Sequence, residues 1–124
     1  MGAIRLLLVD DDAAVAELLK KYLERLGYEV DACTAPEDAL TRFDAEPQRY
    51  SLVLTDLTLP GMNGEQLLDR MRQSNPKLRA IISSGYPYQP RARRVTFLQK
   101  PFLPKMLAEA VEQALNSPDL RPGL

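Results

Sequence analysis

Short apolar segments alternate along the chain with longer segments in which apolar residues recur every three or four positions. The first, third and fourth short segments are almost continuously apolar, which is typical of parallel strands covered on both faces. The second alternates weakly and the fifth is brief, yet both still fit strands. We therefore predict strands at residues 4–9, 28–33, 51–56, 79–84 and 95–99.

The longer segments have the period of amphipathic helices. We predict that Asp12 caps the first helix and that Gly27 ends it. The second helix is expected to begin at Thr34 or Ala35, with Pro36 in its first turn, where a missing N–H is tolerated. The apolar face predicted for the first helix consists of Val15, Leu18, Leu19, Tyr22, Leu23 and Leu26. Further helices are predicted at 65–74 and 103–115, the last with Met106, Leu107, Ala110, Val111 and Leu115 on one face.

Strand and helix alternate, which predicts an α/β fold with a parallel five-stranded sheet covered by helices on both faces. One connection departs from this rule. After the fourth strand, only residues 85–95 are available for the connection and for the first residue of the fifth strand. They include Pro87 and Pro90. Either proline would interrupt the interior of a helix. We therefore predict that the helix of this connection, the fourth in order, is shortened or absent.

The composition limits the possible functions. With 124 residues, 45% of them hydrophobic, the chain is expected to form one domain over residues 1–116, followed by a flexible tail or linker at 117–124. A net charge of −1 argues against direct nucleic-acid binding. No apolar run reaches the ~18 residues of a membrane span, and the N-terminus lacks the form of a signal peptide.

Two residue counts add to this. The single cysteine, Cys33, excludes an internal disulfide and fits a cytoplasmic protein. We expect it to be a small buried apolar residue. The absence of histidine excludes histidine-based triads, histidine-ligated zinc and an autophosphorylating histidine on this chain.

Polar residues follow or end four of the predicted strands. They are Asp10 and Asp11 on the first, Asp56 on the third, Ser84 on the fourth and Lys100 on the fifth. Because the carboxyl ends of parallel strands meet at one edge of the sheet, these groups are expected to converge. Three carboxylates within ~4–6 Å repel one another unless one is protonated or a cation lies among them. Such oxygen ligands suit Mg²⁺, beside which a carboxylate can attack a phosphoryl group.

Four short motifs lie at these strand ends. They read LVDDD at 8–12, LTDLTLPGMNG at 54–64, SSGY at 83–86 and LQKPF at 98–102. In this order they resemble the receiver domains of two-component response regulators, which are related to the chemotaxis response regulator. The resemblance extends from residue 4 to about 115. It implies a flavodoxin-like, doubly wound sheet with strand order 2-1-3-4-5, and a phosphorylation-dependent switch in two-component or phosphorelay signalling rather than a metabolic enzyme.

By this resemblance, Asp56 is the residue that accepts a phosphoryl group from a histidine kinase or a histidine phosphotransfer protein. Mg²⁺ is expected to bind directly to Asp11, to Asp56 and to the backbone carbonyl of Thr58. Asp10 is expected to act through a metal-bound water. Asp12, in contrast, is expected only to cap the first helix.

The resemblance also assigns residues that respond to the phosphate. Ser84 occupies the position of the hydroxyl that moves to the phosphate, and Lys100 is expected to pair with it. Ser83 competes for the hydroxyl role, but Ser84 directly precedes a glycine, as in the family pattern. Phe97 occupies the position of the aromatic switch residue, although a core role is equally compatible with the sequence. The bond between Lys100 and Pro101 is expected to be cis.

Two other classes of function remain open. One is a phosphorylation-independent interaction module that keeps the receiver fold. The other is a phosphatase of the haloacid dehalogenase type, although residues 10–14 lack the threonine of its Asp-x-Asp-x-Thr pattern. Receivers commonly dimerise and signal through the face of the fourth helix, fifth strand and fifth helix. We predict that this chain meets a downstream effector, or a second copy, through another surface or through an unusual version of that face built on the arginine-rich residues 91–94.

Overall fold

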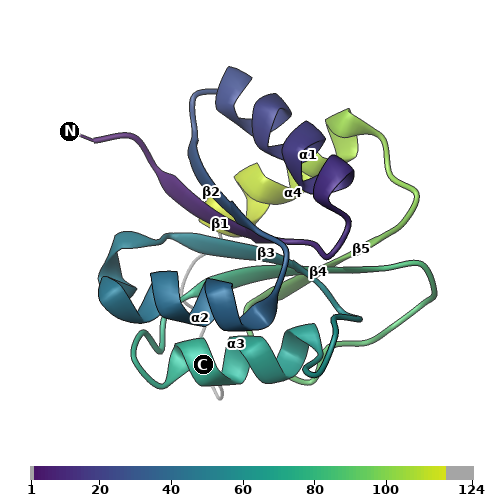
Figure 1. The fold of residues 1–124 in the computed structure, drawn as a ribbon. Coiled ribbons are helices and arrows are strands. Elements are labelled where there is room, and N and C mark those ends of the chain that lie inside the picture. The colour runs from purple at the N-terminus through teal and green to yellow at the C-terminus, as the bar shows by residue number, and fades with distance from the viewer. Residues whose placement is uncertain (1, 117–124) are drawn as a thin grey trace, which may run out of the picture.

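The structure, a computed structural model, describes residues 2–116, so the predicted tail at 117–124 lies outside the described residues. Five parallel strands form one sheet in the order β2-β1-β3-β4-β5 (Figure 1). The predicted α/β class and strand order are therefore confirmed. The strands are β1 (Arg5–Val9), β2 (Glu29–Cys33), β3 (Leu52–Asp56), β4 (Arg79–Ser84) and β5 (Val95–Gln99). The helices are α1 (Ala13–Arg25), α2 (Pro36–Ala45), α3 (Gly64–Arg72) and α4 (Pro104–Asn116), with a 3₁₀ turn at Pro47–Arg49.

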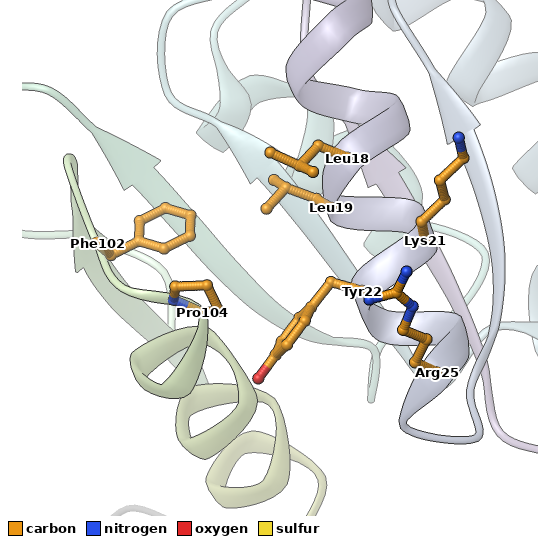
Figure 2. Close-up of a pocket in the computed structure, with 7 residues that line it drawn as sticks. All are labelled: Leu18, Leu19, Lys21, Tyr22, Arg25, Phe102 and Pro104. Carbon is orange, nitrogen blue, oxygen red and sulfur yellow. The ribbon is translucent and has the colours of Figure 1, made fainter.

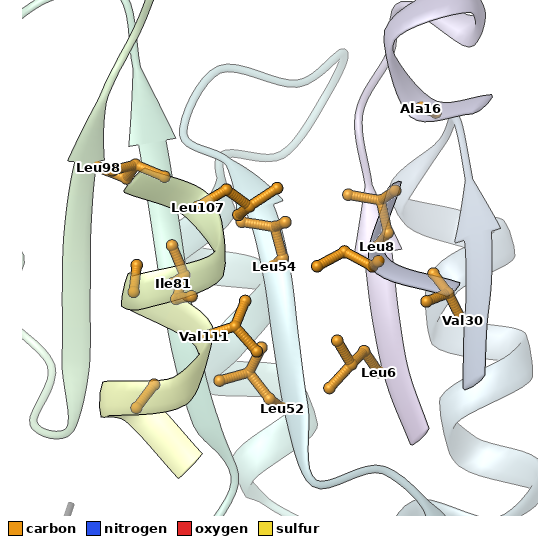
Figure 3. Close-up of a cluster of buried hydrophobic side chains, with 13 residues drawn as sticks. Leu6, Leu8, Ala16, Val30, Leu52, Leu54, Ile81, Leu98, Leu107 and Val111 are labelled. Atoms are coloured by element: carbon orange, nitrogen blue, oxygen red, sulfur yellow. The ribbon is translucent and has the colours of Figure 1, made fainter. Parts of the chain in front are cut away.

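Helices cover both faces of the sheet, α1 and α4 on one side and α2 and α3 on the other (Figure 1). Successive residues of each strand point to opposite faces. The strands contribute to the α1/α4 core Leu6, Leu8, Val30, Leu52, Leu54, Ile81 and Leu98 (Figure 3). They contribute to the α2/α3 core Leu7, Val9, Cys33, Val53 and Ala80. Within residues 2–116, no helix has both the length and the apolar character needed to cross a membrane.

The ends of α1 follow from its sequence. Asp12 accepts hydrogen bonds from the backbone N–H groups of Ala14 and Val15, at 3.0 and 3.2 Å. These bonds satisfy two of the free donors at the helix start. Gly27 follows the last turn with φ +100°, a left-handed conformation that glycine adopts without steric cost. Both predicted helix ends are confirmed.

The predicted apolar faces of α1 and α4 are wider than the surfaces that the helices bury. Leu18 is 67% exposed, Leu26 47% and Met106 44%. α1 lies on the sheet through Ala16 and Leu23 instead, so residues at the margin of its apolar stripe remain accessible. A groove of about 330 Å³ lies between α1 and the start of α4, and its lining includes Leu18, Leu19, Tyr22, Phe102 and Pro104 (Figure 2).

Residues 85–94, named here the β4–β5 connection, contain no helix. The prediction for this segment is therefore confirmed. Glu65, in the first turn of α3, accepts hydrogen bonds from the backbone N–H groups of Arg91 and Ala92, both at 2.9 Å. Its other carboxylate oxygen accepts a hydrogen bond from the Tyr88 hydroxyl. One carboxylate on α3 thus fixes both the middle and the later part of the connection.

The end of α3 makes a second set of contacts. Arg72 donates two hydrogen bonds to the backbone carbonyl of Leu78, at 2.9 and 2.6 Å, and one to that of Arg94, at 3.3 Å. Arg94 has a positive φ of 55° and donates to the backbone carbonyl of Pro76 at 2.6 Å. These bonds join the start of β4 and the end of the β4–β5 connection to α3.

Candidate functional site

Side chains from three strands meet at the carboxyl edge of the sheet. Asp56 ends β3, Asp10 follows β1 and Lys100 follows β5. The Nζ atom of Lys100 lies 2.7 Å from Oδ1 of Asp56 and 3.3 Å from Oδ2 of Asp10. This convergence agrees with the expectation that the carboxyl ends of parallel strands meet at one edge of the sheet.

The turn after Asp56 positions α3 against the site. The N–H of Gly64 donates a hydrogen bond of 2.7 Å to the carbonyl of Leu57. A Cβ atom at Gly64 would overlap the backbone carbonyl oxygen of Asp56, so only glycine lets α3 begin this close. A capping box between Asn63 and Gln66 fixes the first turn of the helix.

Three carboxylates form an acidic cluster. One oxygen from each of Asp10, Asp11 and Asp56 lies within 4.8 Å of the other two. Asp10 and Asp56 are 2% and 8% exposed, whereas Asp11 is exposed to solvent. Hard oxygen ligands that are open to water on one side fit Mg²⁺, which binds through one or two carboxylates and keeps several waters. The residues present therefore fit the ion that the resemblance implies.

The electrostatics of the cluster favour a cation. Burial, together with the negative charge of Asp10, raises the pKa of Asp56 to about 6, although Lys100 acts in the opposite direction. Burial alone would lower the pKa of Lys100, but its ion pairs with Asp56 and Asp10 outweigh this effect and raise it. One lysine thus faces three acids, and an additional positive charge would relieve the remaining repulsion.

A cavity of about 110 Å³ opens beside Asp56 and is lined by Asp56, Thr58, Ser83, Ser84, Gly85 and Lys100. Ser84 therefore lies at the site, but its Oγ accepts a hydrogen bond from the N–H of Tyr86, at 3.1 Å. The carboxylate of Asp56 instead accepts a hydrogen bond from the hydroxyl of Ser83, whose Oγ donates to Oδ1 at 2.9 Å. The family pattern favours Ser84 for the hydroxyl role and leaves Ser83 as the alternative. Predicting this contact requires the register of β3 and β4, in which Asp56 is paired with Ser83.

Phe97 and Lys100 are the last two predicted residues. Phe97 is partly buried in β5, and its ring lies 6.5 Å from the ring of Tyr88 between centroids, at an angle of 53°. Phe97 therefore contacts the β4–β5 connection. It lies two residues before Gln99, the last residue of β5. The Lys100–Pro101 peptide bond is cis, as the resemblance implied.

A doubly wound parallel sheet that ends in a lysine-linked acidic cluster defines a class of signalling domain built on the flavodoxin-like fold. Residues 6–112 match the model of the response regulator receiver domain family. The chain belongs to this family. It is therefore a receiver domain of two-component signal transduction.

Similar proteins agree with this assignment. The chain is 38% identical over 119 residues to the regulatory protein VanRB of Enterococcus faecalis, covering 92% of this chain but only 53% of VanRB. It is 32% identical to the response regulator receiver protein CpdR of Brucella abortus, covering 90% of this chain and 96% of CpdR. The crystal structure of the receiver domain of the hybrid histidine kinase CckA superposes with a TM-score of 0.82 and 34% identity, covering 90% of this chain and 98% of that one. The chain thus spans about half of VanRB and nearly all of CpdR.

Proposed function

We propose that Asp56 is the phosphoacceptor of this receiver domain. The observation that carries the proposal is the ion pair between Asp56 and Lys100, 2.7 Å long, beside the acids Asp10 and Asp11 at the carboxyl edge of the sheet. A buried carboxylate with one fixed cation beside it can act as a nucleophile toward a phosphoryl group. The remaining acids then serve to bind a divalent cation.

The donor is a phosphohistidine of a histidine kinase or a histidine phosphotransfer protein. A carboxylate oxygen of Asp56 forms a bond to phosphorus while the P–N bond of the donor breaks. The electron pair of that bond stays with the imidazole nitrogen. Lys100 remains charged, since its pKa is raised, and it neutralises part of the charge on the transferring group. The domain catalyses this transfer and the later hydrolysis of its own acyl phosphate, and acts as a switch rather than as a metabolic enzyme.

Mg²⁺ would be held by Asp11, Asp56 and the backbone carbonyl of Thr58, with Asp10 acting through a bound water. When bound, the ion neutralises phosphoryl charge that Lys100 alone cannot balance. Asp10 is more buried than Asp11, and it is already oriented by Lys100 and by the N–H of Asp12, at 2.9 Å. These contacts support a role for Asp10 in orienting the metal environment.

Ser84 connects the phosphorylated state to the rest of the domain. Phosphorylation adds roughly −1.5 to −2 charges at Asp56, which attract the Ser84 hydroxyl and Lys100. If Ser84 turns to the phosphate, its Oγ leaves the N–H of Tyr86, at the start of the β4–β5 connection. Phe97 packs against the same connection through Tyr88 and is the proposed aromatic switch residue. Downstream effectors, or a second copy in a homodimer, would then recognise this altered surface.

The proposed receiver domain spans residues 1–116. Acetyl phosphate with Mg²⁺ tests its function. We expect the wild-type domain to gain the mass of one phosphoryl group and Asp56→Asn to gain none. Asp12→Asn is the matched control, because it removes an acid from the same loop while asparagine caps the helix as well as aspartate does. Equal phosphoryl uptake by Asp56→Asn and the wild type would contradict the assignment.

Two further assays, ligand binding and phosphate-ester turnover, separate the two alternatives. A phosphorylation-independent interaction module would bind neither Mg²⁺ nor beryllofluoride. A haloacid-dehalogenase-type phosphatase would turn over a small phosphate ester, and would lose that activity in Asp10→Asn but keep it in Asp56→Asn. The contacts of Asp12 argue against the phosphatase, because the second acid of its Asp-x-Asp pattern caps α1 instead of facing the site.

A further inference from the structure

Four residues at the site continue a row of side chains that belongs to the hydrophobic core. Leu8, Leu54, Ile81 and Leu98 all face α1 and α4 (Figure 3). Side chains alternate along a strand, so the residue two positions further in each strand faces the same side. Within β3 and β4 these residues are Asp56 and Ser83, and the same spacing reaches Asp10 directly after the end of β1 and Lys100 directly after the end of β5. Ser83 therefore belongs to the same row as the phosphoacceptor, whereas Ser84 does not.

The sheet register places Ser83 directly beside Asp56. The two residues are paired across β3 and β4. Ser83 donates its hydroxyl proton to Oδ1 of Asp56 at 2.9 Å, and its backbone carbonyl accepts the N–H of Leu57 at 2.7 Å. Ser83 is 3% exposed, so water does not compete with its hydroxyl for the carboxylate. Ser83 thus contacts the phosphoacceptor through its side chain and the following residue through its backbone.

The two donors at the site converge on one oxygen. Both Ser83 Oγ and Lys100 Nζ contact Oδ1 of Asp56, at 2.9 and 2.7 Å. A carboxylate that accepts hydrogen bonds from two donors at one oxygen has its rotation fixed, and the other oxygen keeps its lone pairs available. We propose that Ser83 is a positioning residue that orients the Asp56 carboxylate so that Oδ2 is the oxygen that bonds to phosphorus.

This assignment rests on the proposed function of Asp56 and deepens it. Ser83 contacts the carboxylate of Asp56 itself, so the contribution proposed for it is to the orientation of the nucleophile. Lys100 is expected to turn to the phosphoryl oxygens as they arrive, and the Ser83 bond then holds Oδ1 through the transfer. A hydroxyl that was only satisfying its own burial would contribute to the free energy of unfolding but not selectively to the rate of phosphorylation.

Phosphorylation by acetyl phosphate with Mg²⁺ tests the proposal, with urea unfolding of each variant measured in parallel. We expect Ser83→Ala to remain folded and to be phosphorylated on Asp56 about tenfold more slowly than the wild type, the rate change that ~1.4 kcal/mol produces. Ser83→Thr, which keeps the hydroxyl, should recover most of that rate. Ser84→Ala is the neighbouring control, and its phosphorylation should slow by a smaller factor than that of Ser83→Ala.

The outcomes distinguish the two proposals. A wild-type rate in folded Ser83→Ala overturns the positioning role while leaving Asp56 as the phosphoacceptor. A folded Ser83→Thr that is as slow as Ser83→Ala also overturns it, because the hydroxyl would then not be the group that matters. If the wild type and Asp56→Asn take up phosphate equally, the proposed function itself fails, and the assignment of Ser83 fails with it.

Discussion

The chain passes from β3 to β4 and from β4 to β5 by two different means. The first passage contains α3, which buries Leu67, Leu68 and Met71 against the sheet. The second, the β4–β5 connection, contains no helix. Its backbone and Tyr88 donate hydrogen bonds to Glu65 of α3, and its carbonyl at Arg94 accepts one from Arg72 of α3. The first passage therefore owes its order to apolar area removed from water, and the second to a few directional bonds.

This difference has a practical consequence. Apolar burial is spread over many contacts, so no single polar substitution on the surface of α3 is expected to detach this helix from the sheet. The β4–β5 connection depends on two side chains of α3, Glu65 near its start and Arg72 at its end. Substituting these residues should loosen the connection while the sheet and helices persist. The connection also carries Tyr86, whose N–H contacts Ser84, so its order is linked to the site.

The largest loss in the free energy of unfolding is expected for Arg72→Met. This change keeps an unbranched apolar stem but removes the guanidinium that binds the carbonyls of Leu78 and Arg94. Hydrogen bonds from charged groups contribute about 1.5–3 kcal/mol, so we expect a loss of about 2–3 kcal/mol in the free energy of unfolding, measured in urea. Arg70→Met is the matched control, because Arg70 is exposed in the same last turn of α3. Equal losses in the two variants would show that the carbonyl contacts of Arg72 are unimportant.

An intermediate loss in the free energy of unfolding is expected for Glu65→Gln, and the size of this loss should depend on pH. Burial alone would raise the pKa of Glu65, but hydrogen bonds from Tyr88 and from the N–H groups of Ala92 and Arg91 outweigh it and lower the pKa below 4.5. The folded protein therefore favours the ionised form. The stabilisation by Glu65 is complete above the ordinary pKa and is lost as the pH falls through the lowered value.

At neutral pH we expect Glu65→Gln to lose about 1–2 kcal/mol in the free energy of unfolding. As the pH falls through the lowered pKa of Glu65, the difference between this variant and the wild type should shrink. Urea unfolding of both proteins across the acidic range measures this difference. Asp69→Asn removes an exposed acid from the same helix and should change stability by less than about 0.5 kcal/mol at neutral pH. A difference between Glu65→Gln and the wild type that is independent of pH would contradict the role of the carboxylate.

The smallest effect is expected for Tyr88→Phe. It removes one hydroxyl, which donates to Glu65, and keeps the ring that contacts Phe97. We expect a loss of about 0.5–1 kcal/mol and faster amide hydrogen exchange at Arg91 and Ala92. Tyr86→Phe removes a hydroxyl from a residue that is 53% exposed and should leave this exchange unchanged. Equal exchange in the two variants would mean that the hydroxyl of Tyr88 does not order the connection.

The same contrast marks the limit of prediction from the sequence. Apolar periodicity predicts the strands and helices, and the rule that parallel strands end at one edge predicts that Asp10, Asp56 and Lys100 meet. Pro87 and Pro90 predict the missing helix because proline interrupts helices wherever the fold places it. These inferences depend only on local sequence and on general topology.

The remaining features depend on contacts between distant residues. The bonds of Glu65 join α3 to a segment that lies 23 to 27 residues away, and no local pattern specifies them. Leu18 is exposed in the groove between α1 and the start of α4, and periodicity does not give the placement of these two helices. The contact between Ser83 and Asp56 requires the register of β3 and β4, and a shift of one residue would have placed Ser84 there instead.

The row that runs from the core into the site constrains changes in chain length. Removing one residue inside β3, between Leu52 and Asp56, would turn every strand side chain on one side of the deletion to the opposite face of the sheet. Asp56 would then leave the edge that it shares with Lys100, or Leu52 would leave the α1/α4 core. The same holds for an insertion. Point substitutions can therefore alter the chemistry of the site one side chain at a time, whereas an insertion or deletion inside β3 displaces either the core residue or the nucleophile.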